Sequence, residues 1–186
     1  MNGVVVMLMA GGAGTRLNIL AHQRAKPAVP FGGIYRIIDF TLSNATNSGL
    51  DRIGILTQYR PSSLMDHIGD GSYWKSERGG SDLKILPPYT GGMANDWYRG
   101  TADAVHQNLR FVEAHGGDTV LVLSGDHVYY MDYRPLIQYH EEKRADLTIA
   151  TLEIPWSDAH RFGLTNVDAD FRIIGFDEKP MKPKSN

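Results

Sequence analysis

Residues 4–17 read VVVMLMAGGAGTRL, a short apolar run that passes directly into a glycine-rich segment. An apolar run of this length without polar alternation is typical of a strand that is covered on both faces, as in a parallel sheet. Glycines let the backbone turn with positive φ and approach a phosphate closely, while consecutive N–H groups and Arg16 offer donors to its oxygens. The stretch therefore predicts a first strand followed by a phosphate-binding loop.

Two better-known phosphate loops fit this segment poorly. No Gly-Lys-Ser/Thr sequence ends it, as a P-loop requires, and Leu17 stands where a dinucleotide-binding loop has its third Gly or Ala. The next expected strand comes much later and lacks the acidic residue that a dinucleotide fold needs at its end. A plain strand-to-helix turn is the alternative, but Arg24, Lys26 and Arg36 follow among prolines and glycines, which favours an anion site.

Three further apolar runs resemble the first and alternate with helical patterns. The runs are residues 53–56, 120–123 and 147–150. Helices are expected near Pro61, from a possible N-cap at Thr101 to the glycines at 116 and 117, and from about Asp132 onward. Alternating strands and helices imply right-handed βαβ units, and hence an α/β fold with a doubly wound, mostly parallel sheet.

Two other segments predict a hairpin and a long loop. Residues 163–167 and 172–176 flank an Asp-Ala-Asp turn and predict a β-hairpin. Residues 73–95 are rich in Gly, Ser and Pro and predict a loop of a length that is often functional.

Composition limits the class of protein. The 186 residues are 42% hydrophobic and carry a formal net charge of −2, which suits one ordinary core and gives no basic field for nucleic acid. No apolar run approaches the roughly 20 residues of a membrane helix, and the first strand begins without a basic leader. The absence of cysteine excludes disulfides and thiolate chemistry. We expect a cytoplasmic protein that binds neither nucleic acid nor a membrane.

Asp126 follows the run at 120–123, so we expect it at the carboxyl end of a strand, where open α/β sheets bind ligands. The glycine-rich segment occupies the same end of its own strand, and the two motifs should converge on one edge. A carboxylate is a hard oxygen ligand suited to Mg²⁺, whereas a simple Asx turn is the alternative. His127 should point away from Asp126, as neighbours on an extended chain do, and play a structural or supporting role. Tyr129, Tyr130 and Tyr133 are expected to be packing residues.

Several segments, read together and in order, resemble the glucose-1-phosphate adenylyltransferases, also called ADP-glucose pyrophosphorylases. They are GGAGTRL at 11–17, RAKPAVPFGG at 24–33, YRIIDF at 35–40, LSN at 42–44, TQY at 57–59, WYRGTADAV at 97–105, SGDHVY at 124–129, FGL at 162–164 and EKP at 178–180. The glycine-rich segment alone indicates only the wider sugar-nucleotidyltransferase superfamily. RAKP and YRGTADA narrow the resemblance to the ADP-glucose branch, and it implies a Rossmann-like nucleotidyltransferase fold.

Members of this family transfer AMP from ATP to glucose 1-phosphate with Mg²⁺, giving ADP-glucose and pyrophosphate for glycogen or starch synthesis. The resemblance implies a role for each matched residue. The triphosphate falls to Gly11, Gly12, Gly14, Thr15, Arg16 and Lys26; the adenine to Gln58 and Gly100; the nucleotide or sugar to Tyr98 and Thr101; the metal to Asp126; and glucose with its phosphate to Glu178 and Lys179. Arg16, Lys26 and Asp126 are the expected catalytic groups.

The resemblance also implies a domain arrangement. Residues 1–186 would be the nucleotide-binding part of a catalytic domain. Full-length relatives continue with the rest of that domain and a left-handed β-helix that helps to form a homotetramer, neither of which is in this sequence. Ile34 stands where many bacterial relatives carry a lysine for a sugar-phosphate activator, so we expect a weak or different effector response.

Two other functions stay open. A sister nucleotidyltransferase would use dTTP, UTP or GTP in place of ATP, because the glycine-rich segment is common to the superfamily. A non-catalytic regulatory subunit would keep the fold and lose the chemistry. Retention of Arg16, Lys26, Asp126 and Lys179 argues against the second of these alternatives.

Overall fold

The chain divides into two units, Met1–Pro135 and Leu136–Asn186, in a computed structural model. The structure describes residues 3–12, 14, 17, 19–20, 23–74, 82–88 and 97–182. Each unit has its own sheet, and the larger first unit contains both of the segments with which the sequence argument began.

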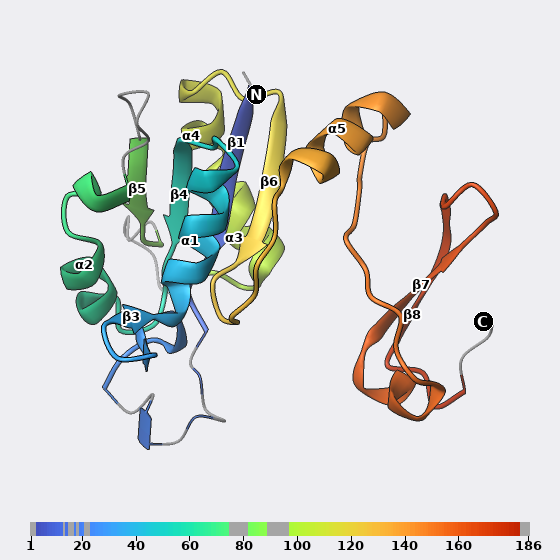
Figure 1. Cartoon of the computed structure of the whole chain (residues 1–186), viewed down its shortest axis with the longest axis horizontal. Coiled ribbons are helices and arrows are strands. Elements are labelled where there is room, and N and C mark those ends of the chain that lie inside the picture. Colours follow the sequence, from blue (N-terminus) through green and yellow to red (C-terminus); the bar gives the residue numbers. More distant parts are fainter. Residues whose placement is uncertain are drawn as a thin grey trace. The chain divides into compact units, whose positions relative to one another are not determined.

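Strands and helices alternate in the first unit (Figure 1). The strands are β1 (Val4–Met9), β2 (Pro30–Phe31), β3 (Tyr35–Arg36), β4 (Arg52–Leu56), β5 (Asp82–Leu86) and β6 (Thr119–Ser124). The helices are α1 (Ile37–Asn47), α2 (Ser62–Ile68), α3 (Thr101–Gln107) and α4 (Leu109–Ala114), with 3₁₀ turns η2 (Lys26–Ala28) and η3 (Ser72–Trp74). Helix α5 (Arg134–Lys143) begins at the boundary between the units.

The main sheet has four strands in the order β5-β4-β1-β6, and every neighbouring pair is parallel. β1 is an inner strand, and the side chains of Val4 to Leu8 are all buried. Burial of consecutive residues means that both faces of β1 are covered, as its unbroken apolar sequence predicts. The predicted strands at β1, β4 and β6 and the parallel α/β fold are confirmed.

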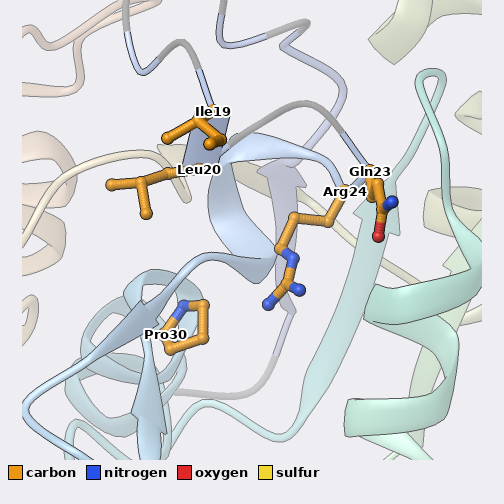
Figure 2. A pocket seen from close by; sticks show the side chains of 5 residues that line it. All are labelled: Ile19, Leu20, Gln23, Arg24 and Pro30. Atoms are coloured by element: carbon orange, nitrogen blue, oxygen red, sulfur yellow. The ribbon is translucent and has the colours of Figure 1, made fainter.

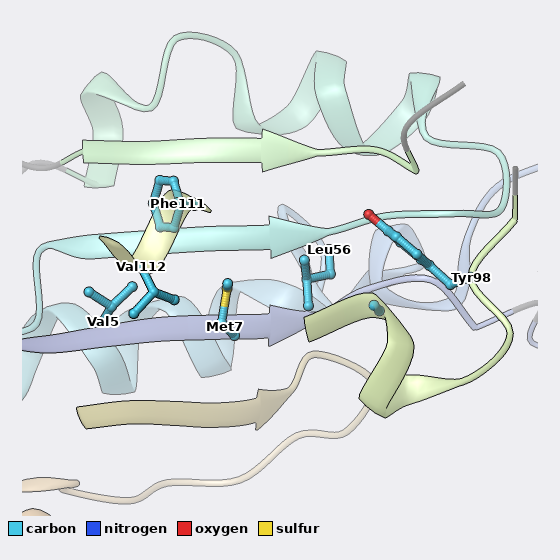
Figure 3. Packing of buried hydrophobic residues seen from close by; sticks show 7 residues of the cluster. Val5, Met7, Leu56, Tyr98, Phe111 and Val112 are labelled. Carbon is cyan, nitrogen blue, oxygen red and sulfur yellow. The ribbon is translucent and has the colours of Figure 1, made fainter. Parts of the chain in front are cut away.

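Helices cover the two faces of this sheet (Figure 1). On one face, Phe111 and Val112 of α4 pack with Val5 and Met7 of β1, in a cluster that also holds Leu56 and Tyr98 (Figure 3). Gly54 of β4 makes room for this packing, since a Cβ there would lie 3.1 Å from carbons of the Phe111 ring.

Helix α1 packs on the opposite face of the sheet. Its Ile38 and Leu42 are fully buried, and the Thr41 hydroxyl donates to the backbone carbonyl of Ser124, 3.1 Å away. The carboxylate of Asp39 accepts a hydrogen bond from the Arg36 N–H at 2.8 Å and so satisfies one free donor at the start of the helix. These contacts fix α1 against the end of β6.

The second unit contains η4 (Trp156–Arg161) and the antiparallel strands β7 (Gly163–Val167) and β8 (Ile173–Glu178). The pairing runs from Gly163 opposite Glu178 to Val167 opposite Ile173, with a register shift between Asn166 and Val167. The predicted hairpin is confirmed, although its second strand begins and ends slightly later than expected.

Two expectations about strands and loops were wrong. The segment 73–95, expected as one long loop, contains η3 and the edge strand β5. Residues 147–150, expected as a strand, form no regular element, and Leu147 is 70% exposed. In the described parts of the chain this run pairs with no strand, and an isolated strand leaves its backbone groups without partners.

The helices also differ from the sequence expectation in detail. The helix expected from Thr101 to the glycines at 116 and 117 is divided at Asn108, whose side-chain amide donates to the Ala104 carbonyl and so ends α3. Thr101 is the first helical residue and not the cap. Helix α1 was not anticipated. No helix within the described residues has both the length and the apolar character needed to cross a bilayer.

Replacing Phe111 with Ala should lower the free energy of unfolding by about 3 kcal/mol, because the ring leaves a cavity between α4 and the sheet. Leu109 of the same helix is 39% exposed, so Leu109→Ala is the matched control and should cost less than about 1 kcal/mol. Urea unfolding followed by circular dichroism measures both. Equal losses in the two variants would contradict the packing described for this face.

Candidate functional site

The register of the main sheet brings three strand ends to one row. Met9 pairs with Leu56 on one side and with Ser124 on the other. Two positions beyond this row stand Gly11, Gln58 and Asp126. The expected convergence of the glycine-rich segment and Asp126 on one edge is confirmed, and the edge is the one where parallel sheets bind ligands.

Close packing explains the glycine at position 11. A Cβ on Gly11 would lie 3.1 Å from the Cβ of Gln58 and 3.2 Å from its backbone nitrogen. Gly12 has open space around it, and Gly14 has φ +65°, a conformation that favours glycine. Thr15 and Arg16, to which the sequence gives phosphate contacts, lie outside the described residues.

Asp126 is surrounded by donors. Its Oδ2 accepts from Lys26 Nζ at 2.8 Å, and its Oδ1 accepts from Ser124 Oγ at 2.6 Å. His127 Nδ1 lies 3.1 Å from the same Oδ1. Because an ionised carboxylate only accepts hydrogen bonds, Nδ1 must carry the proton in this contact.

The pKa of Asp126 lies well below its usual range. Partial burial acts in the opposite direction, since it disfavours the charged form, but the hydrogen bonds from Lys26, Ser124 and His127 outweigh it, helped by the positive charge of Lys26. The Asp126 carboxylate is therefore ionised throughout the neutral range.

Lys26 is held in place by its backbone. It is the first residue of η2, and the Val29 N–H donates to its carbonyl at 3.1 Å. The Arg36 guanidinium donates to the Ala28 carbonyl at 3.2 Å and to the carbonyl and hydroxyl of Ser63 at 2.7 and 2.6 Å. Arg36 therefore ties η2 to α2 and keeps Lys26 beside Asp126.

A second ion pair supports the same region. Asp39 of α1 is buried, and its Oδ1 lies 2.6 Å from Nε2 of His67 on α2. Together with the contacts of Arg36, this pair joins η2, α1 and α2 into one structure beneath Lys26.

These features match a known family. The family model for nucleotidyl transferases matches residues 5–186. The chain belongs to the nucleotidyl transferase family.

Curated relatives of this nucleotidyl transferase are similar over nearly the whole chain. One from Thermotoga maritima is 56% identical over 186 residues, all of this chain and 44% of its own length. Those from Geobacillus stearothermophilus and Clostridium acetobutylicum are 53% and 52% identical over 98% of this chain and 47% and 48% of their own lengths. All three are named glucose-1-phosphate adenylyltransferase. The chain thus spans less than half the length of these relatives.

The residues expected at the adenine lie along the same edge of the nucleotidyl transferase sheet. Gln58 follows β4, and its Nε2 donates to the Tyr98 carbonyl at 3.4 Å. Gly100 precedes α3 with an extended backbone, and a Cβ at this position would meet no atom within 4 Å, so this stretch is open. Thr101, the next residue, is exposed. Gln58 and the segment before α3 are therefore brought together.

Tyr98 is placed differently from the other predicted contacts. It is 8% exposed and belongs to the core cluster (Figure 3). Its hydroxyl donates to the Leu86 carbonyl at 3.1 Å and accepts from the Asn108 amide at 2.9 Å, and burial raises its pKa. The side chain thus supports the segment around Gly100, and its contact with nucleotide or sugar stays a prediction.

A pocket of about 410 Å³ lies next to the segment that carries Lys26. Its lining consists of Ile19, Leu20, Gln23, Arg24 and Pro30 (Figure 2). Arg24, one of the cations that the sequence groups with Lys26, thus faces an open space where an anion has access.

Glu178 and Lys179 belong to the second unit. Lys179 Nζ lies 2.8 Å from Glu178 Oε1, and both side chains are exposed. Lys179 has φ +45°, and its N–H donates to the Phe162 carbonyl at 3.1 Å, which fixes the backbone where β8 ends. The two residues predicted to bind the sugar phosphate are therefore neighbours in space as well as in sequence.

Two contacts of Asp126 were missed at the sequence level. Ser124 was recognised only as part of a motif, although a hydroxyl two positions before an aspartate at a strand end is a recognisable signal for such a contact. The expectation that His127 points away was wrong, because residues 125–127 form a bend and not an extended strand. Tyr133 is buried as expected, whereas Tyr130 is 90% exposed and is no packing residue.

A divalent metal fits this site through Asp126. Within the described ranges, no three His, Asp or Glu side chains are grouped as a metal cage. Mg²⁺ is often bound by one or two carboxylates together with substrate phosphates, so a single ionised carboxylate beside a phosphate loop is compatible with it.

The pKa of Asp126 should rise toward its ordinary range in Lys26→Met, because the variant loses the main hydrogen bond and charge that lower it. In the wild type, a pKa lower in the folded state than in the unfolded state gives stability above the unfolded-state pKa, and this is lost as the pH falls through the folded-state value. The ¹³Cγ shift of Asp126 in an acid titration measures the change. Lys84→Met, which removes a lysine beside Asp82, is the control and should leave Asp126 unchanged.

Proposed function

We propose that the whole protein transfers AMP from ATP to glucose 1-phosphate, giving ADP-glucose and pyrophosphate, and that residues 1–186 are the nucleotide-binding part of its catalytic domain. The observation that carries the proposal is the position of Gly11 and Asp126, which follow adjacent parallel strands at one row. The names of the relatives, all similar over at least 98% of this chain, support the choice of substrates.

The reaction needs no protein nucleophile. A sugar phosphate already carries a charged oxygen that can attack the α-phosphorus of ATP, so the catalytic problem is repulsion between anions. Cations and oriented N–H groups reduce that repulsion and hold the attack in line with the leaving pyrophosphate. Lys26 and the backbone of Gly11, Gly12 and Gly14 supply such groups, and we assign Thr15 and Arg16 to the same phosphates.

Asp126 would hold the metal ion, which we take to be Mg²⁺. When bound, the ion supplies positive charge that neutralises phosphate oxygens. Ser124 and His127 keep the carboxylate ionised and oriented for this purpose. The protein's own contribution is thus an acceptor of fixed direction next to a loop of donors.

The remaining contacts follow the elements that carry them. Gln58 and Gly100 would lie at the adenine, with Thr101 and the segment anchored by Tyr98 beside them. Glu178 would bind sugar hydroxyls and Lys179 the sugar phosphate, as an exposed carboxylate and ammonium are suited to do.

The two alternatives predict different behaviour. The family description alone covers enzymes for any nucleoside triphosphate, so a sister enzyme would prefer dTTP, UTP or GTP. A regulatory subunit would bind nucleotide without turnover. The ion pair between Lys26 and Asp126 opposes this last alternative, because both groups that the chemistry needs are present and in contact.

A chimera tests the proposed function. Residues 1–186 replace the matching part of the Thermotoga maritima relative, and pyrophosphate release is measured with glucose 1-phosphate and each of four nucleotides. We expect turnover with ATP at least about tenfold above that with UTP, dTTP or GTP, the equivalent of about 1.4 kcal/mol of discrimination. Preference for another nucleotide, or no turnover while ATP binds, would favour an alternative.

In the same chimera, Asp126→Asn should lower turnover by about 100-fold or more, since loss of an oriented charge or metal ligand costs on the order of 3 kcal/mol. Lys179→Ala should instead raise the KM for glucose 1-phosphate, because it removes ground-state binding. Lys84→Ala, in the edge strand β5, is the control and should change neither constant. Unchanged kinetics in Asp126→Asn and Lys179→Ala would refute the assigned roles.

A further inference from the structure

The two oxygens of Asp126 have different partners. Oδ1 has two donors from its own segment, Ser124 Oγ at 2.6 Å and His127 Nδ1 at 3.1 Å. Oδ2 has one donor among the described residues, Nζ of Lys26, which comes from a position 100 residues earlier in the chain. The partner of Oδ2 belongs to a different element, so it can leave without disturbing the bend that carries Asp126.

Lys26 therefore occupies the oxygen that a metal ion needs. A divalent cation requires a direct bond to a carboxylate oxygen, and Oδ1 is already held by two donors. An ammonium and a divalent cation cannot both lie against Oδ2, because like charges at such short range repel.

We propose that Lys26 is an exchangeable occupant of the metal position: a divalent cation displaces its ammonium from Asp126 Oδ2, and the displaced ammonium becomes available to phosphate oxygens. The inference rests on the proposed function in one respect, that Asp126 is the metal ligand. It adds that metal binding and triphosphate binding are coupled through a single lysine side chain. Because coupling of two binding events is reciprocal, phosphate that captures Lys26 also improves metal binding.

The chain is built to let the side chain move while the backbone stays. The backbone of η2 is held by the Val29 N–H on the Lys26 carbonyl and by Arg36 on the Ala28 carbonyl. The Lys26 side chain is 30% exposed and has a flexible four-carbon stem, so its ammonium can change partners by rotation about side-chain bonds.

Ser124 and His127 are positioning residues in this exchange. They keep their hold on Oδ1 when Lys26 leaves Oδ2, so the carboxylate does not turn with it. The backbone around them is fixed in turn, since the Ser124 carbonyl accepts from Thr41 and the Gly125 N–H donates to the Met9 carbonyl at 3.0 Å.

The test measures Mn²⁺ affinity of the nucleotide-free chain by the electron paramagnetic resonance signal of free Mn²⁺. Lys26→Met removes the ammonium and keeps most of the stem, and it should bind Mn²⁺ about tenfold more tightly than the wild type, which corresponds to about 1.4 kcal/mol. Lys26→Arg keeps a cation and should stay within about threefold of the wild type. Asp126→Asn should lose the site.

The outcomes separate the exchange from the proposed function. If Asp126→Asn weakens Mn²⁺ binding while Lys26→Met leaves the affinity of the wild type unchanged, the exchange is refuted and Asp126 remains a metal ligand. If Asp126→Asn binds Mn²⁺ as the wild type does, Asp126 is no metal ligand and both fail. Equal affinity of Lys26→Met and the wild type, including the case in which neither binds, overturns the exchange.

A second measurement uses the wild-type chain and does not depend on the folding of a variant. Lysines are acetylated with and without Mg²⁺, and the rate at Lys26 is read by mass spectrometry against the exposed Lys84. Mg²⁺ should raise the relative rate at Lys26 several-fold, because the free ammonium reacts once its partner is taken. In Asp126→Asn the rate should be high with and without Mg²⁺, whereas a wild-type rate that Mg²⁺ leaves unchanged would overturn the proposal.

Discussion

The parallel register of β4, β1 and β6 is the constraint on which the candidate site depends. Met9, Leu56 and Ser124 lie opposite one another, so the residues that follow each strand emerge together. Side chains alternate along a strand, and a slip of one position in β6 would turn its whole pattern to the other face. Burial of β1 on both faces excludes such a slip, because every register error would remove apolar side chains from one of two packed helix layers.

The same arrangement explains why opposite charges stand together at this edge. A phosphate site needs cations, and cations held close to one another without a ligand repel. Asp126 offsets part of that cost, because it accepts Lys26 directly and remains ionised. The carboxylate thus has two functions in the proposed cycle, as a partner for Lys26 before the substrates bind and as a metal ligand afterwards.

The sequence predicts the inner part of the sheet and not its edge. β1, β4 and β6 consist of apolar runs, and a buried parallel strand must have such a run. β5 was missed because Asp82 and Lys84 interrupt its pattern, and an edge strand tolerates charges on its open side. Helix α1 was missed because Thr41 and Asn44 are buried polar residues, which pair with backbone carbonyls of distant segments and hide the apolar period.

For the site, the reach of sequence reasoning ends at the same physical boundary. The shared edge of Gly11 and Asp126 follows from strand ends alone, whereas the contacts of Asp126 with Ser124 and His127 depend on a local bend that no periodicity encodes. The proposed roles also divide between the units: the groups for the triphosphate and metal lie in the first, and Glu178 and Lys179 lie in the second. The proposed phosphate and metal binding therefore belongs to Met1–Pro135, and a defect confined to the sugar phosphate would point to Leu136–Asn186.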